Sequence, residues 1–470
     1  MKRVAAFILI AVFCHAMPAL AGSAKTIADL KFPELAFHPP KTVRVDLKNG
    51  MTLHLLEDHE LPLVDISAMV RTGSVYVPKE KAGLATLTGH LWRSGGIKSI
   101  PPSELDEQLE FMGAMMETGI GLDSGSIGLR VMSKDLDTGL ALFADLIKNP
   151  AFDEGRFTVM KNQMIEGLRR QNDDPDSLVE REFMRAAYPS HPFGMMPTIK
   201  SVTGITVDEC RKFYYDHTGP ENFIIGIAGD FDPKDVVARF EKLFSDFPPA
   251  KEKFGAIPDV GDDLTPGIYL VDKKLPQTAI RMGHIGLSRK DPDFETARVM
   301  NYILGGGGFS SRLMKEVRTV KGLAYSVWSY FTGGDSGKGV FMIGGETKAS
   351  TTHEFISTSR ELMRRVMSDG VSPDELEMAK EAIINSFIFA FDKNSDVITR
   401  YLWIDYYGMP KDYLETYRDK IRAVTMARVK EVAARHLRPD KMIVLAVGDG
   451  EKINSDLKKL GAVNTIEPEQ

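Results

Sequence analysis

Alternating apolar and polar residues mark the first strands of the chain. The stretch KTVRVDLKNGMTLHLLED contains two such runs around Asn49-Gly50, which predicts a β-hairpin. The stretch LVDISAMVRTG continues the alternation and predicts a third strand. Helical patterns then dominate, and we expect mostly helix from Ala82 to about Tyr215. NFIIGIAGD predicts a buried strand, and PKDVVARFEKLFSDF predicts an amphipathic helix after it.

The second half of the chain opens with a similar pattern. Strands are predicted at Ile268–Val271 and Thr278–Gly286. A helix is predicted around Asp293–Leu304, with Asp291 as a possible N-cap and Pro292 at the first helical position.

A glycine-rich stretch follows, YILGGGGFSSRLMKEVRTVKGLAYSVWSYF. The four glycines predict the end of one helix, and Ser310 or Ser311 is a candidate cap for the short helix that ends near Arg318. A strand is predicted after Gly322. Its alternation places Tyr325, Val327 and Ser329 on one face and Ala324, Ser326 and Trp328 on the other.

The two halves are similar in sequence. TVDECRKFYYDHTGPENFIIGIAGD, from Thr206, aligns without a gap with TMARVKEVAARHLRPDKMIVLAVGD, from Thr425, at an offset of 425 − 206 = 219 residues. Two further pairs follow in the same order. FDEGRFTVMKNQMIEGL aligns with SPDELEMAKEAIINSF, and EDHELPLVDISAMV aligns loosely with VDKKLPQTAIRMGHI. The sequence therefore predicts an internal duplication.

These patterns predict an α+β fold of two homologous domains arranged as a clamshell with a cleft between them. Each domain is expected to be a largely antiparallel sheet packed with helices. The segment FPPAKEKFGAIPDVGDDLTPG is rich in proline, glycine and charge, so residues 247–267 are predicted to be the linker. The domains are then 22–246 and 268–470.

The first 21 residues are typical of a secretory signal peptide. A basic MKR, an apolar VAAFILIAVFCHAM and a terminal PALA predict cleavage before Gly22. The apolar run is short for a membrane span, so we expect no stable anchor. Cleavage removes Lys2 and Arg3 and no acid, so the net charge changes from −6 to −8, which argues against nucleic-acid binding. We expect an exported protein, periplasmic or secreted, of a Gram-negative bacterium. Cys210 is then the one remaining cysteine, which excludes an internal disulfide.

A family resemblance rests on LKNGMTLHLLEDHELPLVDISAMVRTGSVYVPKEKAGLATLTGHLW. This stretch resembles the opening of the pitrilysin/insulinase family of zinc peptidases, which includes the mitochondrial processing peptidases. The similarity continues through QNDDPDSLVEREF, YPSHPFG, NFIIGIAGDFDP and LGGGGFSSRLMKEVRTVKGLAYSVWSYF. Internal duplication is also a feature of that family.

The zinc motif of active members is degenerate here. In those members, a helix carries His-x-x-Glu-His, whose two imidazoles bind zinc while the glutamate acts as general base. The resemblance places the histidines at Thr86 and His90, the general base at Gly89 and the later carboxylate ligand at Gly167, next to Glu166. A catalytic zinc takes three protein ligands, so we expect neither zinc nor peptidase activity in this chain alone.

The histidines also have interpretations that involve no metal. His90 is expected to pack beside Thr86 along the edge of the stripe formed by Leu84, Leu87 and Leu91. A second candidate pair, His54 and His59, has the wrong spacing for a shared metal and is interpreted as solvated surface.

The second half keeps candidate substrate-binding residues. In the family, an arginine and a tyrosine bind the substrate backbone and polarise the carbonyl under attack, and the resemblance places them at Arg318 and Tyr325. A cation and a phenol can both donate to a developing oxyanion. The alternative from the residues alone is an arginine at a helix end and a tyrosine that fills a strand. Gly306, Gly307, Gly308 and Phe309 are interpreted as a flexible lip that contacts substrate.

Some bacterial members of the family are heterodimers in which one subunit has lost the zinc motif. The resemblance implies that this chain is the noncatalytic, substrate-binding subunit of an exported zinc metalloendopeptidase that cleaves peptides in a closed chamber. Zinc would belong to a homologous partner with an intact His-x-x-Glu-His motif, and no cofactor is expected in this chain. Two alternatives stay open. One is a non-proteolytic structural or assembly protein of the same fold, and the other is a homodimer that binds peptides without cutting them.

Overall fold

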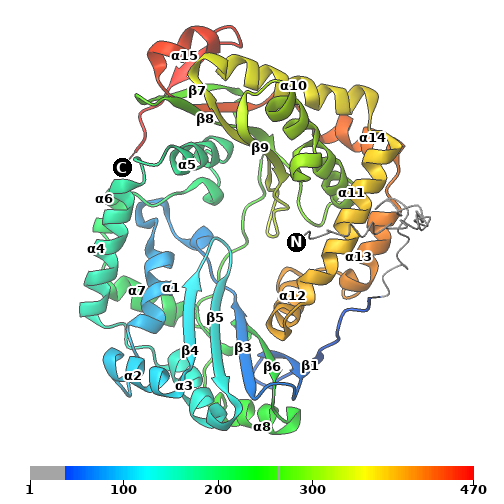
Figure 1. The fold of residues 1–470 in the computed structure, drawn as a ribbon. Coiled ribbons are helices and arrows are strands. Elements are labelled where there is room, and N and C mark those ends of the chain that lie inside the picture. Colours follow the sequence, from blue (N-terminus) through cyan, green and yellow to red (C-terminus); the bar gives the residue numbers. More distant parts are fainter. Residues whose placement is uncertain (1–36, 262–263, 470) are drawn as a thin grey trace, which may run out of the picture. The chain divides into compact units, whose positions relative to one another are not determined.

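Two six-stranded mixed sheets form the frame of the protein in this computed structural model, which describes residues 37–261 and 264–469 (Figure 1). The first sheet has the order β1-β2-β6-β3-β5-β4 and the second the order β12-β7-β11-β8-β10-β9. The predicted signal peptide, residues 1–21, lies outside the described residues. The strands are β1 (Val43–Asp46), β2 (Thr52–Glu57), β3 (Leu63–Val70), β4 (Met115–Ile120), β5 (Gly125–Met132), β6 (Phe223–Gly229), β7 (Gly267–Asp272), β8 (Gln277–Ile285), β9 (Ala324–Phe331), β10 (Val340–Lys348), β11 (Ile443–Gly448) and β12 (Val463–Thr465).

Helices cover both sheets, and many begin at the residues that local sequence favours. Thr206 and Ser372 form capping boxes at the starts of α7 and α11. The helices are α1 (Leu84–Ser94), α2 (Pro102–Met112), α3 (Leu136–Lys148), α4 (Glu154–Arg170), α5 (Pro175–Ala187), α6 (Ile199–Thr203), α7 (Val207–His217), α8 (Pro233–Leu243), α9 (Phe294–Asn301), α10 (Thr352–Asp369), α11 (Pro373–Ser386), α12 (Asn394–Tyr407), α13 (Tyr413–Arg422), α14 (Met426–His436) and α15 (Gly450–Leu457).

The sheet orders confirm the α+β fold and agree with the duplication in sequence. The series β2-β6-β3-β5-β4 of the first sheet has the same topology as β7-β11-β8-β10-β9 of the second. In both sheets the second strand of the series runs parallel to the first and antiparallel to the third. The sixth strand differs, because β1 comes from the Asn49-Gly50 hairpin whereas β12 follows α15. The predicted hairpin and the strands β3, β6, β7 and β8 are confirmed.

One part of the predicted pattern was wrong. Strands β4 and β5 occupy residues 115–132, inside the region expected to be mostly helical. Glycines and serines interrupt the apolar residues of GLDSGSIGLRVM, so the period of two is weak there. The pairing of β5 with β3 along its full length sets the strand conformation instead.

The halves exchange one helix each, as Figure 1 shows for α5 beside β8 and α12 beside β3 and β6. Helix α5 packs Leu178, Val179 and Phe183 against the second sheet. Arg281 of β8 fixes it there, because its guanidinium donates to Asp176 and Glu180 at 2.7 Å. Helix α12 in turn packs Ile398, Leu402 and Tyr406 on the first sheet against Ile224 and Ala228 of β6.

His54 takes part in this exchange, so its interpretation as solvated surface was wrong. Its side chain is buried, and its Nε2 lies 2.8 Å from Asp405 Oδ2 of α12. Its Nδ1 lies 3.0 Å from Thr42 Oγ1. Arg44 donates to the same carboxylate at 2.8 Å. His59 is exposed, as expected, and contacts Glu57 and Asp230.

The segment that connects the two sheets packs against the first half of the chain. Phe254 stacks on Tyr76 and on His217, with ring centres 4.2 and 4.4 Å away. The Glu252 N–H donates to the Asp216 carbonyl at 2.8 Å. We propose the boundaries 22–246, 247–267 and 268–470 for the two domains and their linker.

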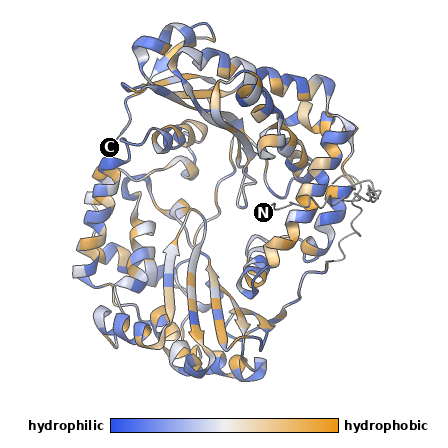
Figure 2. Cartoon of the chain, viewed as in Figure 1, coloured by the Kyte–Doolittle hydropathy of each residue, from blue (hydrophilic) through white to orange (hydrophobic). Residues whose placement is uncertain are grey.

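Apolar residues concentrate between each sheet and its helices, and the outer sides of the helices are polar (Figure 2). This pattern explains how each half buries its own core. In the described part of the chain, no helix is both long and apolar enough to cross a membrane.

Candidate functional site

Helix α1 carries the first candidate site. Leu84, Leu87 and Leu91 are buried in the core of the first half, as their helical spacing predicts. Thr86 is half-buried and His90 is exposed. The helix therefore has a core face and an open face, and the imidazole lies on the open one.

Helix α4 packs against α1, so the two elements that carry the candidate zinc positions do meet. Met160 contacts Ser94 at one end of α1, and Met164 lies close to Gly83 at the other. Gly167 has no side chain and borders open space, and the neighbouring Glu166 is exposed and paired with Arg169. The scaffold for a metal site is present, whereas the ligand set at these positions does not fit zinc.

Gly89 explains how closely α1 approaches the sheet. A Cβ at this position would lie 2.2 Å from the backbone nitrogen of Ile120 in β4. Thr118 of β4 enters the hydrogen-bond ladder of the helix, where its hydroxyl donates to the Gly89 carbonyl at 2.7 Å. The same hydroxyl accepts from the Arg93 N–H at 3.1 Å. No side chain, and so no general base, fits at position 89 unless the helix or the strand moves.

We expect Gly89→Ala to destabilise the protein by about 2 kcal/mol, because the contact with β4 outweighs the better helix propensity of alanine. Urea unfolding measures this effect. Gly167→Ala is the matched control, since nothing lies within 4 Å of its added Cβ. It should stabilise the protein by about 0.5 kcal/mol. Equal effects of the two substitutions would contradict the close packing at Gly89.

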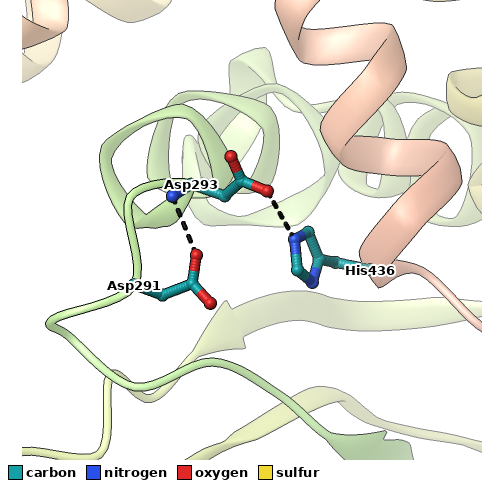
Figure 3. Close-up of side chains that lie close together, drawn as sticks. All are labelled: Asp291, Asp293 and His436. Atoms are coloured by element: carbon teal, nitrogen blue, oxygen red, sulfur yellow. Dashed lines mark hydrogen bonds and ion pairs between the residues drawn. The ribbon is translucent and has the colours of Figure 1, made fainter.

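A different group of metal-binding side chains lies close together elsewhere (Figure 3). Among the described residues, the group Asp291, Asp293 and His436 is the one found, and it does not include His90. His436 Nε2 lies 2.8 Å from Asp293 Oδ2. Arg428 and Arg435 pair with the same carboxylate. A metal ion would meet two guanidinium groups here, so we interpret the group as a structural ion-pair network.

The helix that follows this network begins later than the sequence predicted. Helix α9 begins at Phe294, so Pro292 is not its first residue, and Asp293 rather than Asp291 is the N-cap. The Asp291 carboxylate accepts instead from the Asp293 N–H at 2.9 Å (Figure 3). The α-helix ends at Asn301, and a π-helical segment, η7 (Tyr302–Gly306), continues it.

The glycine stretch lies between η7 and a second π-helical segment, η9 (Met314–Val320). Gly305 is buried, and a Cβ there would lie 2.4 Å from Ser329 Oγ of β9. Gly308 has φ +56° and starts a short 3-10 turn, η8 (Gly308–Ser310). Asn301 fixes the base of this stretch, because its side chain donates to the Ser329 carbonyl and accepts from the Ser329 hydroxyl. π-Helical segments occur often at functional sites.

Arg318, Phe309 and Tyr325 come together at this end of the second half. The Arg318 guanidinium lies 4.7 Å from the ring centre of Phe309 and 4.6 Å from that of Tyr325. Phe309 is 69% exposed and Tyr325 is 83% exposed. No carboxylate among the described residues pairs with Arg318, so its N–H groups are available to a ligand. The structure thus brings the predicted arginine and tyrosine together.

A β-bulge orients Tyr325. Strand β9 is at the edge of the second sheet and pairs with β10, with a register shift between Gly345 and Thr347. Ala324 and Val327 therefore both face the core, and Tyr325 does not share a face with Val327 as simple alternation predicted. Bulges of this kind re-aim side chains next to functional sites. No local sequence pattern indicates this bulge, and Phe309, predicted as part of the lip, also contacts Arg318.

Comparisons with known proteins agree on one family. Residues 54–196 match the model for the insulinase family, peptidase family M16, and residues 204–383 match the model for the peptidase M16 inactive domain. An uncharacterized zinc protease of Rickettsia bellii is 27% identical over 78% of this chain and 89% of its own length. The non-peptidase homolog YmxG of Helicobacter pylori is 22% identical over 84% of this chain and 91% of its own.

A solved structure gives the same picture. The crystal structure of a peptidase M16 inactive domain from Pseudomonas fluorescens has a TM-score of 0.79 and 27% identity. The match covers 87% of this chain and 98% of that one. The similar proteins thus include both zinc proteases and non-peptidase homologues by name.

Proposed function

The chain belongs to the insulinase family, peptidase family M16, as a noncatalytic member, and we propose that it is the substrate-binding subunit of a heterodimeric zinc metalloendopeptidase. The observation that carries the proposal is the Arg318 guanidinium, held between exposed Phe309 and Tyr325 rings without a carboxylate partner among the described residues. Arg318 itself is half-buried, and a guanidinium that stacks on aromatic rings keeps its N–H donors for a ligand.

The two halves of the chain differ in the chemistry that their side chains can perform. Helix α1 presents Thr86, Gly89 and His90, and α4 presents Gly167, so His90 is the one zinc-binding side chain at these four positions and position 89 has no general base. Arg318 and Tyr325 can donate hydrogen bonds to a peptide carbonyl and stabilise negative charge that develops on its oxygen. The chain therefore supplies substrate binding, and a homologous partner with His-x-x-Glu-His supplies zinc and the general base.

The substrate in this proposal is an extended peptide. Strand β9 is an edge strand, so part of its backbone has no partner in the sheet and can pair with a further strand. The segment η7, which ends at Gly306, packs against β9, and the exposed Phe309 that follows the glycines offers an apolar surface to a substrate side chain. We propose that the peptide lies along this edge in a chamber closed by the partner.

The same proposal places the complex outside the cytoplasm, in the periplasm or secreted. The support is the signal-like sequence of residues 1–21 and the net charge of −8 after its removal, which disfavours nucleic acid as a ligand.

The test is to purify residues 22–470 together with a homologous chain that carries His-x-x-Glu-His. We expect a one-to-one complex by light scattering, one zinc per complex by metal analysis and cleavage of quenched fluorescent peptides. Each chain alone should cleave at least about 100-fold more slowly than the complex.

Two results would overturn this function. Full activity of the partner alone would remove any role in turnover, and one tightly bound zinc in this chain alone would contradict its noncatalytic assignment. A stable complex whose activity does not depend on Arg318 would favour a structural or assembly role. Peptide binding by a homodimer without cleavage would favour the remaining alternative.

A further inference from the structure

A cavity of about 390 Å³ lies in the helical layer of the second half. The loop before α9, α9 itself, the end of α11, α12 and α13 line it together with η11 (Phe387–Phe391). This volume is at the lower end of the range for small-molecule pockets. The residues that line the cavity do not include any from Gly305 to Phe331, the segment that carries Arg318 and Tyr325.

Among the residues that the structure describes, three arginines and no carboxylate line this cavity: Arg289, Arg298 and Arg400. Arg289 is fixed, because its guanidinium lies 5.2 Å from the Phe294 ring centre and 5.1 Å from that of Trp403, and its Nε donates to Asp335. Within residues 37–261 and 264–469, neither Arg298 nor Arg400 has an ion-pair partner. Two uncompensated guanidinium groups at one cavity favour an anionic ligand.

Aromatic rings form much of the remaining wall. Phe387 and Tyr417 are stacked with ring centres 4.9 Å apart, and Trp403 and Tyr413 lie 5.5 Å apart. The Arg298 guanidinium lies 5.4 Å from the Tyr417 ring centre. Flat aromatic surfaces pack well against a flat ring, so the wall favours a ligand with an aromatic part.

The Tyr417 hydroxyl is a buried polar group in the wall of the cavity. The residue is 2% exposed, and its oxygen has no hydrogen-bond partner among the residues that the structure describes. Buried polar groups nearly always have a partner. Burial raises the pKa of Tyr417 to about 12, so the hydroxyl remains protonated at neutral pH. Because the oxygen has almost no accessible surface, the aromatic ring of Tyr417 rather than its hydroxyl faces a molecule in the cavity.

We propose that this cavity binds a small molecule in which a flat aromatic ring carries a carboxylate or phosphate group. Arg298 and Arg400 bind the anionic group, and the ring packs against the aromatic wall that includes Tyr417. The proposal uses side chains that the peptide-binding function does not need, so either can fail without the other.

Titration calorimetry on the purified chain with four probes tests this site. Adenosine monophosphate and N-acetyl-L-tryptophan each combine a ring with an anion. N-acetyl-L-tryptophanamide lacks the charge, and inorganic phosphate lacks the ring. We expect one combined probe to bind with a Kd below about 1 mM, and about tenfold more tightly than the single-feature probes. Which combined probe binds more tightly identifies phosphate or carboxylate. Failure of both at about 5 mM would overturn the proposal.

Substitutions then locate the binding. The double variant Arg298→Gln, Arg400→Gln should weaken binding by about tenfold or more. Tyr417→Phe keeps the aromatic wall and removes a hydroxyl without a hydrogen-bond partner among the described residues, so it should bind within about twofold of the wild type. Arg170→Gln, an exposed arginine on α4, is the matched control and should bind as the wild type does. Unchanged affinity in the double variant would place the binding elsewhere and overturn the proposal.

Discussion

Replacing Arg318 with alanine is expected to lower the turnover of the two-chain complex by about 100-fold or more. The substitution removes the cation that lies between Phe309 and Tyr325. If this cation donates to the peptide carbonyl in the transition state, its loss should lower kcat more than it raises KM. Folding should not change, because Arg318 has no ion pair in the described residues whose loss would leave a buried charge. The measurement is steady-state cleavage of a quenched fluorescent peptide by the reconstituted complex.

Two variants separate the chemistry of Arg318 from its charge alone. Arg318→Lys keeps the charge but loses the planar group that stacks between the two rings, so we expect about a tenfold loss of turnover. Lys315→Ala removes an exposed cation from the same segment, η9, and should change turnover by less than about twofold. Equal effects of Lys315→Ala and Arg318→Ala would mean that only the surface charge matters. That result would contradict the assigned role of Arg318.

Much of the fold was accessible from sequence because the duplication and the periodic patterns agree with each other. The Asn49-Gly50 turn, the apolar strand β6 and the repeat at an offset of 219 residues each predicted elements that the structure contains. Strands β4 and β5 could not be recognised, because their apolar residues are interrupted and their pairing with β3 is a long-range effect. The exchange of α5 and α12 could not be predicted from the sequence either, because an apolar helix face does not indicate which sheet it packs against.

The candidate site was also predictable from the sequence only in part. The residue types at positions 86, 89, 90 and 167 were enough to predict that α1 and α4 lack a zinc ligand set. The reason that a side chain at position 89 destabilises the fold is the close approach of β4, which no local sequence pattern indicates. Arg318 and Tyr325 were predicted as a pair, whereas the bulge that exposes Tyr325 depends on the register between β9 and β10.

The second large effect concerns stability. Asp293→Asn is expected to lower the free energy of unfolding by about 3 kcal/mol. Asp293 is 1% exposed, and its carboxylate is paired with Arg428, Arg435 and His436. Removing the negative charge leaves three donors around a buried neutral group. This loss of free energy of unfolding is at the low end for a broken buried ion pair, because both arginines reach solvent. Urea unfolding at pH 7 measures the loss.

Asp291→Asn is the control for this network. The Asp291 carboxylate accepts one hydrogen bond from the Asp293 N–H, and the amide oxygen of asparagine can accept it equally well. We therefore expect a change within about 0.5 kcal/mol. If both variants lost the same stability, the cause would be the turn before α9 rather than the charge of Asp293.

The pKa of Asp293 determines the direction in which stability changes with pH. Burial raises the pKa of Asp293, but the hydrogen bond from His436 and the charges of the two arginines outweigh it, so the pKa lies below its usual value. The stabilisation by the Asp293 carboxylate is present above the unfolded-state pKa, about 4, and is lost as the pH falls through the lower folded-state pKa. The difference in free energy of unfolding between wild type and Asp293→Asn should therefore narrow below about pH 4.

Burial also lowers the pKa of the nearby His284 to about 4, which removes stability from both proteins alike between about pH 6.5 and 4. Because that loss cancels in the comparison, a difference that stays constant down to pH 3.5 would show that the Asp293 charge does not stabilise the fold.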